Sequence, residues 1–141
     1  MNLDKKIGIL GLGESGYWAA ILAHKLGYQV FISESKDEIS AKYSDELKKL
    51  NIFIEYGGHT ENFLNSVDLI VKSPGIPKNS NIMKRVLDKK IDVVSEIEFA
   101  SNFSKIRNIC ITGTNWKTTT VSCLFEVLKN KFKVLKSGNI G

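Results

Sequence analysis

A glycine-rich segment, Gly11-Leu12-Gly13-Glu14-Ser15-Gly16, joins a short apolar run at 7–10 to a helically spaced apolar pattern over 17–26. Three glycines at this spacing permit a tight turn, close approach of the backbone to a diphosphate, and close packing of the next helix. Residues 28–32 are again mostly apolar. The segment therefore predicts a strand, a turn, a helix and a second parallel strand, which is a β-α-β unit.

The same alternation continues as far as residue 104. We expect further strands over 52–56, 67–71 and 91–94, and helices over 37–50, 60–65, 81–89 and from 95 onward. Strands that alternate with helices form a parallel sheet covered on both faces. The prediction is an α/β fold with a Rossmann-like doubly wound parallel sheet over 1–104, closed by a polar linker at 101–105.

A second phosphate motif follows the linker. A strand expected from Arg107 leads into Gly113-Thr114-Asn115-Trp116-Lys117-Thr118-Thr119 and a helical pattern over 118–130. In a P-loop, backbone N–H groups surround phosphate oxygens, the lysine reaches the β and γ phosphates, and the next hydroxyl binds Mg²⁺. Residues 105–141 are thus predicted to be the truncated start of a P-loop ATPase domain, with another strand at 132–135.

The residue before the lysine departs from the P-loop pattern. G-x-x-x-x-G-K-[ST] has a glycine at that position, whereas this chain has Trp116. If position 116 has a positive φ, a residue other than glycine costs roughly 1–2 kcal/mol, and the indole also crowds the phosphates. We therefore expect ATP binding to be weakened or lost. The threonines at 118–120 have a simpler alternative role as a helix cap.

The residues alone leave the ligand of the first domain open. Glu34 follows the second expected strand, where an acidic residue would meet the ribose of NAD. Ser73-Pro74-Gly75 follows the fourth, at the carboxyl edge where open α/β sheets bind ligands. The glycine turn fits a dinucleotide, another nucleotide diphosphate or packing alone. The Ser73 turn fits a phosphate or sugar site, or a rigid turn.

Composition excludes several other classes of protein. The chain has 141 residues, 43% of them hydrophobic and 25% charged, which is typical of a globular protein. Its net charge is +5, but lysines alternate with acidic residues, so nucleic-acid binding is not expected. There is neither a membrane-spanning run nor a signal-peptide pattern, which favours the cytoplasm without membrane insertion.

The metal-binding residue types show no site. Cys110 and Cys123 lack C-x-x-C spacing and are expected to be buried, reduced thiols. His24 and His59 have no partnering ligands in the sequence, so we assign them surface or packing roles.

Two phosphate motifs in tandem, together with Ser73-Pro74-Gly75-Ile76 and the closing Gly138-Asn139-Ile140-Gly141, resemble the amino-terminal part of the Mur ligases. The Ser-Pro-Gly-Ile signature is most similar to the family members that add D-glutamate to UDP-N-acetylmuramoyl-L-alanine in peptidoglycan synthesis. The resemblance covers the whole chain, but only the first of the family's three domains and the opening of the second.

The resemblance implies an ADP-forming ligase that acts as a monomer. ATP would phosphorylate the substrate carboxylate, and the amine of D-glutamate would attack the acyl phosphate. Lys117 and Thr118 would be catalytic, with Thr118 also holding Mg²⁺. The implied ligands of the UDP moiety are Glu14, Ser15, Gly16, Glu34, Ser35, Ser73, Pro74, Gly75 and Asn139, and those of ATP are Gly113, Thr114, Asn115, Trp116, Lys117, Thr118 and Thr119.

Because the chain ends at Gly141, before the rest of the second domain, we expect no ligation from it alone. Two other functions compete with the ligase: a stand-alone UDP-sugar or nucleotide-binding module, and an NAD-dependent oxidoreductase domain. The NAD hypothesis ranks last because it leaves the lysine-bearing second loop unexplained.

Overall fold

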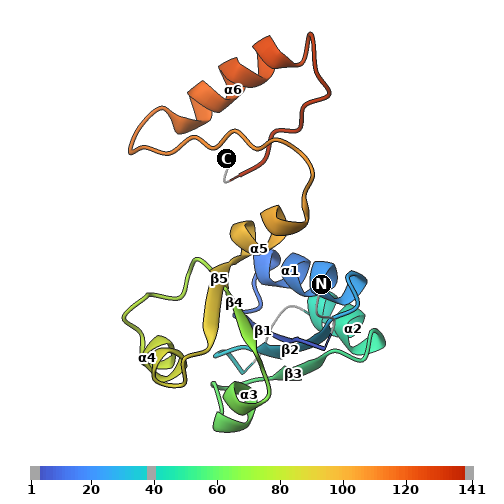
Figure 1. Ribbon diagram of the computed structural model, residues 1–141, viewed down its shortest axis with the longest axis vertical. Helices are drawn as coiled ribbons and strands as arrows, with labels where there is room; N and C mark the ends of the chain where they lie inside the picture. Colours follow the sequence, from blue (N-terminus) through green and yellow to red (C-terminus); the bar gives the residue numbers. More distant parts are fainter. Residues whose placement is uncertain (1–3, 38–40, 139–141) are drawn as a thin grey trace. The chain divides into compact units, whose positions relative to one another are not determined.

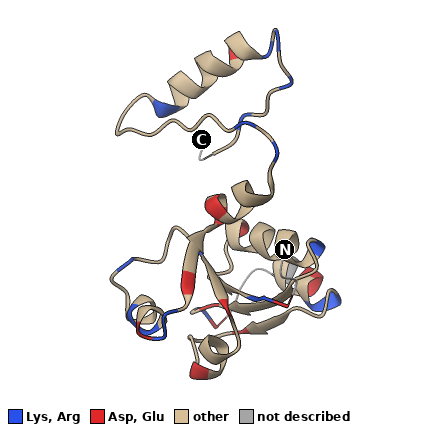
Figure 2. Ribbon diagram, viewed as in Figure 1, with Lys and Arg blue, Asp and Glu red and all other residues tan. Residues whose placement is uncertain are grey.

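The computed structural model describes residues 4–37 and 41–138 (Figure 1). The chain divides into two compact units, residues 1–105 and 106–141. Basic and acidic residues are interspersed along the ribbon of the first unit (Figure 2). No helix in the described parts of the chain is long and apolar enough to cross a membrane.

The first unit is built on a five-stranded parallel sheet. Its order is β3-β2-β1-β4-β5, with β1 in the centre, and Gly8 of β1 pairs with Phe31 of β2 and Ile70 of β4. The strands are β1 (Lys6–Leu10), β2 (Gln29–Ser33), β3 (Phe53–Glu55), β4 (Leu69–Lys72) and β5 (Asp92–Ser95). The chain thus winds outward from β1 in one direction and then in the other, as a doubly wound sheet does.

Helices cover both faces of this sheet (Figure 1). The helices are α1 (Glu14–Lys25), α2 (Ala41–Lys49), α3 (Glu61–Asn65), α4 (Asn81–Asp88) and α5 (Glu96–Phe103). One core cluster joins α1, α2 and α5 to the sheet through Tyr17, Leu47 and Phe99. The other joins α3 and α4 to the opposite face through Phe63 and Val86. The predicted α/β fold is confirmed.

Local signals account for the helix ends. The Thr60 hydroxyl accepts a hydrogen bond from the Phe63 N–H and begins α3. Ser95 and Glu98 form a capping box at the start of α5. The prediction of a linker at 101–105 is wrong in part, since α5 continues to Phe103, whose ring packs edge-on against Phe99 at 5.2 Å. Residues one helical turn apart meet on one face, and this contact extends the helix.

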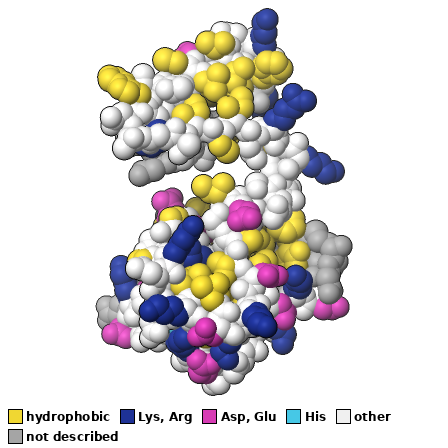
Figure 3. Space-filling model, turned by 60° about the vertical axis from the view of Figure 1, so that its left-hand side comes forward, with side chains coloured by type: hydrophobic (Ala, Val, Ile, Leu, Met, Phe, Trp, Pro, Cys, Tyr) yellow, Lys and Arg dark blue, Asp and Glu magenta, His cyan; other side chains and the backbone are white. Residues whose placement is uncertain are grey.

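Residues 106–138 of the second unit contain one helix, α6 (Lys117–Leu128), none of whose residues is buried. The strands expected from Arg107 and at 132–135 are wrong: both segments are irregular. A strand requires a neighbour that completes its hydrogen bonds, and the described residues of this unit provide none. The expectation of buried thiols is also wrong, because Cys110 and Cys123 are both exposed. Apolar side chains accordingly gather at the surface of this unit (Figure 3).

Candidate functional site

The two turns singled out in the sequence lie at the carboxyl ends of adjacent strands. The Gly11–Gly16 turn follows β1 and the Ser73 turn follows β4. The Ser73 N–H donates to the Leu10 carbonyl at 3.0 Å, and the Gly11 N–H donates to the Ser33 carbonyl at 2.9 Å. The winding direction of the sheet changes between β1 and β4, and open α/β sheets bind ligands at that point.

Gly11 and Gly16 are required by the conformation and packing of the turn itself. Gly11 has a φ of +89°, a region that side chains rarely tolerate. A Cβ on Gly16 would lie 2.1 Å from the Gly11 carbonyl oxygen. Neither glycine is therefore by itself a sign of a ligand.

Gly13 and Gly75 differ, because nothing in the protein requires them to be glycine. Gly13 has a φ of −80°, which any residue adopts, and a Cβ on it would meet no atom within 4 Å. A Cβ on Gly75 would also meet nothing within 4 Å. The missing side chains leave open space at both turns, one of them beside the N-terminus of α1.

The Ser73 turn is held from beneath by the residue before it. The Lys72 ammonium donates to the carbonyls of Ser73 and Ile76, each at 2.8 Å. The Ile76 N–H closes the turn on the Ser73 carbonyl at 3.1 Å. The rigid turn expected as an alternative is thus present, and it leaves Pro74 and Gly75 exposed.

Glu34 is turned inward onto the glycine turn. Its side chain accepts hydrogen bonds from the Leu12 N–H at 2.6 Å, the Lys36 N–H at 3.0 Å and the Ser35 hydroxyl at 3.1 Å, and the residue is 7% exposed. Burial raises the pKa of this carboxyl, but the three hydrogen bonds outweigh burial and hold the pKa below its usual value. Glu34 therefore ties the end of β2 to the turn after β1.

A buried acid that the sequence analysis did not select lies between the two turns. Glu96, 8% exposed, accepts hydrogen bonds at Oε1 from the Ser73 hydroxyl at 2.8 Å and the Ser15 hydroxyl at 3.0 Å. Its position directly after β5 was the available signal, since that strand also ends at the carboxyl edge. Glu14, the neighbour of Ser15, is exposed.

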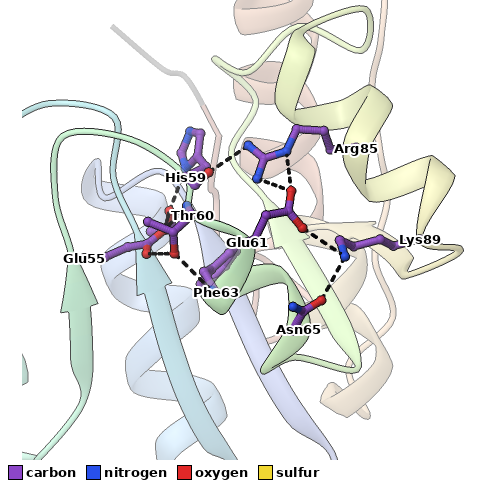
Figure 4. Close-up of polar contacts among 9 residues, drawn as sticks. Glu55, His59, Thr60, Glu61, Phe63, Asn65, Arg85 and Lys89 are labelled. Atoms are coloured by element: carbon purple, nitrogen blue, oxygen red, sulfur yellow. Dashed lines mark hydrogen bonds and ion pairs between the residues drawn. The ribbon is translucent and has the colours of Figure 1, made fainter.

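A second polar cluster holds the turn that follows β3. Ser33 is fully buried and contacts Glu55 at 2.5 Å and His59 Nδ1 at 2.6 Å. Figure 4 shows Glu55 reaching Thr60, whose N–H and hydroxyl donate to it at 3.0 and 2.6 Å. Burial lowers the pKa of His59 and Arg85 lowers it further, against the opposing effect of Glu55 and Glu34. His59 thus has the packing role expected of it.

Arg85 ties this turn to α3 and α4. Its guanidinium donates to the His59 carbonyl at 2.7 Å and to Glu61 Oε1 at 2.6 Å, and Lys89 reaches the other Glu61 oxygen at 3.0 Å (Figure 4). Glu61 thus faces two positive charges, and the network links the turn to both helices.

In the loop of the second unit, the residue before Lys117 has the positive φ on which the expected weakening of ATP binding depended. Trp116 has a φ of +62°, in the left-handed region, and begins α6 as its N-cap without a side-chain hydrogen bond. Its indole is 77% exposed. The Lys117 ammonium donates to the carbonyls of Gly113 and Thr114. The expected cap role of Thr118 is wrong, since Thr118 lies inside α6.

The structure brings together Ser15, Gly16, Ser73 and Glu34 at one edge of the sheet, whereas Asn139 lies outside the described residues. No group of His, Cys, Asp and Glu side chains in the described ranges could hold a metal ion. The roles assigned to individual residues stay predictions.

The sequence of the first unit matches a known protein family. The family described as "Mur ligase MurD-like, N-terminal domain" matches residues 5–95, which are most of the first unit. The chain belongs to this family. The resemblance to Mur ligases is therefore confirmed, and the family match covers the turns after both β1 and β4.

Curated relatives in the same family carry a specific name. The UDP-N-acetylmuramoylalanine–D-glutamate ligase of Christiangramia forsetii is 46% identical over 140 residues, which are 99% of this chain and 31% of the relative. The enzyme of the same name from Bacteroides thetaiotaomicron is 42% identical over 138 residues, again 31% of its length. The chain thus spans about a third of the length of the Mur ligases it matches.

A solved Mur ligase structure has the same fold. The murein peptide ligase of Psychrobacter arcticus superposes with a TM-score of 0.65 at 28% identity, over 89% of this chain and 26% of that chain.

Proposed function

We propose that residues 1–105 bind the UDP moiety of UDP-N-acetylmuramoyl-L-alanine, and that the reaction served is the ATP-dependent addition of D-glutamate to this substrate in the cytoplasm, during peptidoglycan synthesis. The observation that carries the proposal is the open space at Gly13 and Gly75, on two turns that meet at the carboxyl edge of the sheet.

The N-terminus of α1 supports a diphosphate at Gly13. The first N–H groups of a helix have no partner within it and carry a partial positive charge, which favours anions. Gly13 is the N-cap of α1 and makes no side-chain cap. Phosphate oxygens can approach the backbone there because no Cβ stands in the way.

The orientation of Glu34 argues against NAD. In dinucleotide-binding domains the acid after the second strand accepts hydrogen bonds from the ribose. Here three protein donors already occupy the Glu34 carboxylate, which is buried. A carboxylate offers about four acceptor positions, so little capacity is left for a ribose. Other groups at this edge would have to recognise the nucleoside, among them the backbone of Ser35.

For ATP and Mg²⁺, the second unit offers a loop of the required backbone conformation. The left-handed residue directly before Lys117 occupies the position of the P-loop glycine. Lys117 would exchange its contacts with the loop carbonyls for phosphate oxygens, and Thr118 would be the hydroxyl ligand of Mg²⁺. ATP supplies the phosphoryl group that activates the substrate carboxylate.

Calorimetric titration of the chain with UDP, UDP-N-acetylmuramoyl-L-alanine, NAD and ATP tests the proposal. We expect saturable binding of both UDP ligands, no binding of NAD, and weak or absent binding of ATP. Saturable binding of NAD without binding of either UDP ligand would overturn it.

A further inference from the structure

The geometry points to Glu96 as a positioning residue of the nucleotide site: it holds the two ligand-facing turns together and makes the hydroxyls of Ser15 and Ser73 hydrogen-bond acceptors toward the ligand. This inference rests on the proposed binding of a UDP ligand at these turns. None of the sequence motifs described above includes Glu96.

One carboxylate oxygen joins three elements that are distant in the sequence. Ser15 belongs to the first turn of α1, Ser73 follows β4, and Glu96 begins α5. Both hydroxyls donate to Glu96 Oε1, at 3.0 and 2.8 Å. Glu96 is thus shared by the glycine turn and the Ser73 turn. The two turns also meet directly, since the Ser73 N–H donates to the Leu10 carbonyl at 3.0 Å, but only Glu96 joins the Ser15 hydroxyl to the Ser73 hydroxyl among the contacts described above.

The single proton on each serine hydroxyl limits the hydrogen bonds that the two serines can form with a ligand. A serine hydroxyl has one proton to donate and two lone pairs. The Ser15 proton is directed at Glu96, and the Ser73 proton at Glu96 or at the more distant Gly11 carbonyl oxygen, 3.4 Å away. Both hydroxyls therefore present only lone pairs to a molecule bound above them. They can accept hydrogen bonds from ribose hydroxyls or from an N–H of the base, but cannot donate to phosphate oxygens.

The charge of Glu96 acts in the same direction. A carboxylate beneath the two hydroxyls repels a phosphate, whereas the N-terminus of α1 attracts one. The diphosphate is therefore assigned to the backbone N–H groups at Gly13, and the uncharged part of the nucleotide to the two serines. At the start of α5 the same carboxylate is stabilised by that helix's own N-terminus.

The test compares three variants of the chain by calorimetric titration with UDP. Glu96→Ala should weaken binding by about tenfold or more, since two hydrogen bonds to a charged acceptor are lost. Glu96→Gln should stay within about threefold of the unmodified chain, because its carbonyl oxygen accepts both hydroxyls. Glu98→Ala is the matched control: it removes the capping box of α5, so it should lower the melting temperature and leave UDP affinity unchanged.

A double-mutant cycle distinguishes positioning from general stability. Replacing Ser15 and Ser73 with alanine should weaken UDP binding in the unmodified chain but have little further effect when Glu96 is already alanine. The outcomes for this inference and for the proposed function can be told apart. If the unmodified chain binds UDP and Glu96→Ala binds it equally well, the positioning role is refuted while the proposed function stands. Equal losses of UDP affinity in Glu96→Ala and Glu96→Gln would also refute the positioning role, since the negative charge of Glu96 and not its hydrogen bonds would then be responsible. If the unmodified chain does not bind UDP, the proposed function itself fails, and this inference with it.

Discussion

Gly13 and Gly16 belong to one turn but are glycine for opposite reasons. At Gly16 a Cβ would lie 2.1 Å from a backbone oxygen of the protein itself. At Gly13 the protein leaves the position free. Substitution at the two sites therefore separates folding from ligand binding.

Gly13→Ala should lower the free energy of unfolding by only about 0.5–1 kcal/mol, because alanine is a poorer N-cap than glycine but meets no atom of the protein. It should weaken UDP binding at least about tenfold, because the methyl group enters the proposed diphosphate space. Gly16→Ala should lower the free energy of unfolding by about 1–3 kcal/mol, as overpacking does. Urea unfolding and calorimetric titration measure the two effects. A Gly13→Ala chain with normal UDP affinity would move the diphosphate away from this turn.

Trp116 has the positive φ on which its expected effect depended. Trp116→Gly should relieve about 1–2 kcal/mol of backbone strain and remove the indole, and should improve ATP binding by about tenfold. Trp116→Ala is the matched control, because it removes the indole and keeps the strain. If glycine and alanine improve ATP affinity equally in a titration, the indole is responsible and the backbone is not; no improvement in either variant means that tryptophan is accommodated.

Among the secondary-structure elements, β2 is joined to the turn after β1 by one side chain, Glu34. Its pKa is lower in the folded protein than in the unfolded chain. The stabilisation is therefore fully present above the unfolded pKa of about 4.3 and is lost as pH falls through the folded value. Acidification should loosen this end of the sheet.

Glu34→Gln should lower the free energy of unfolding at pH 6 by about 1–3 kcal/mol, because the amide cannot accept all three hydrogen bonds. The difference from the unmodified chain should shrink steadily as pH falls below about 4.3. Urea unfolding at a series of pH values between 3 and 6 measures both quantities. A difference that stays constant over this range would mean that the charge of Glu34 does not stabilise the fold.

At the scale of the whole molecule, the chain separates into a unit with a complete sheet and a unit without one. The division between residues 105 and 106 lies in an exposed, irregular stretch that contains Lys105 and Arg107. Exposed segments of this kind are the preferred sites of proteolysis.

Brief digestion with trypsin should therefore cut the chain first after Lys105 or Arg107 and leave a resistant fragment that begins near the N-terminus. Addition of UDP should slow further digestion of that fragment, because a ligand of the folded state stabilises it. Mass spectrometry of the products gives the cleavage points. First cuts within α1 or α4 would contradict the division into these two units.

The sequence was sufficient for the element order of the first unit, because apolar periodicity and turn residues are local signals. The five strands and five helices described within residues 4–37 and 41–105 lie at the expected places, apart from a few residues at their ends and the extension of α5. In the second unit local signals located α6, which was expected over 118–130, but they failed for the strands and the thiols. The expected strands there depended on partners, and the expected burial of Cys110 and Cys123 depended on a second layer.

The sequence by itself determined the family, the parallel sheet and the two turns at its carboxyl edge, since motifs and periodicity are written along the chain. Only the tertiary structure decided what each side chain at that edge does. It turned Glu34 inward onto Leu12, distinguished the open glycine at 13 from the packed one at 16, and placed Glu96 against Ser15 and Ser73. Spacing along a chain does not reveal hydrogen bonds between residues that are 23 and 81 positions apart, because such contacts form only when the strands align.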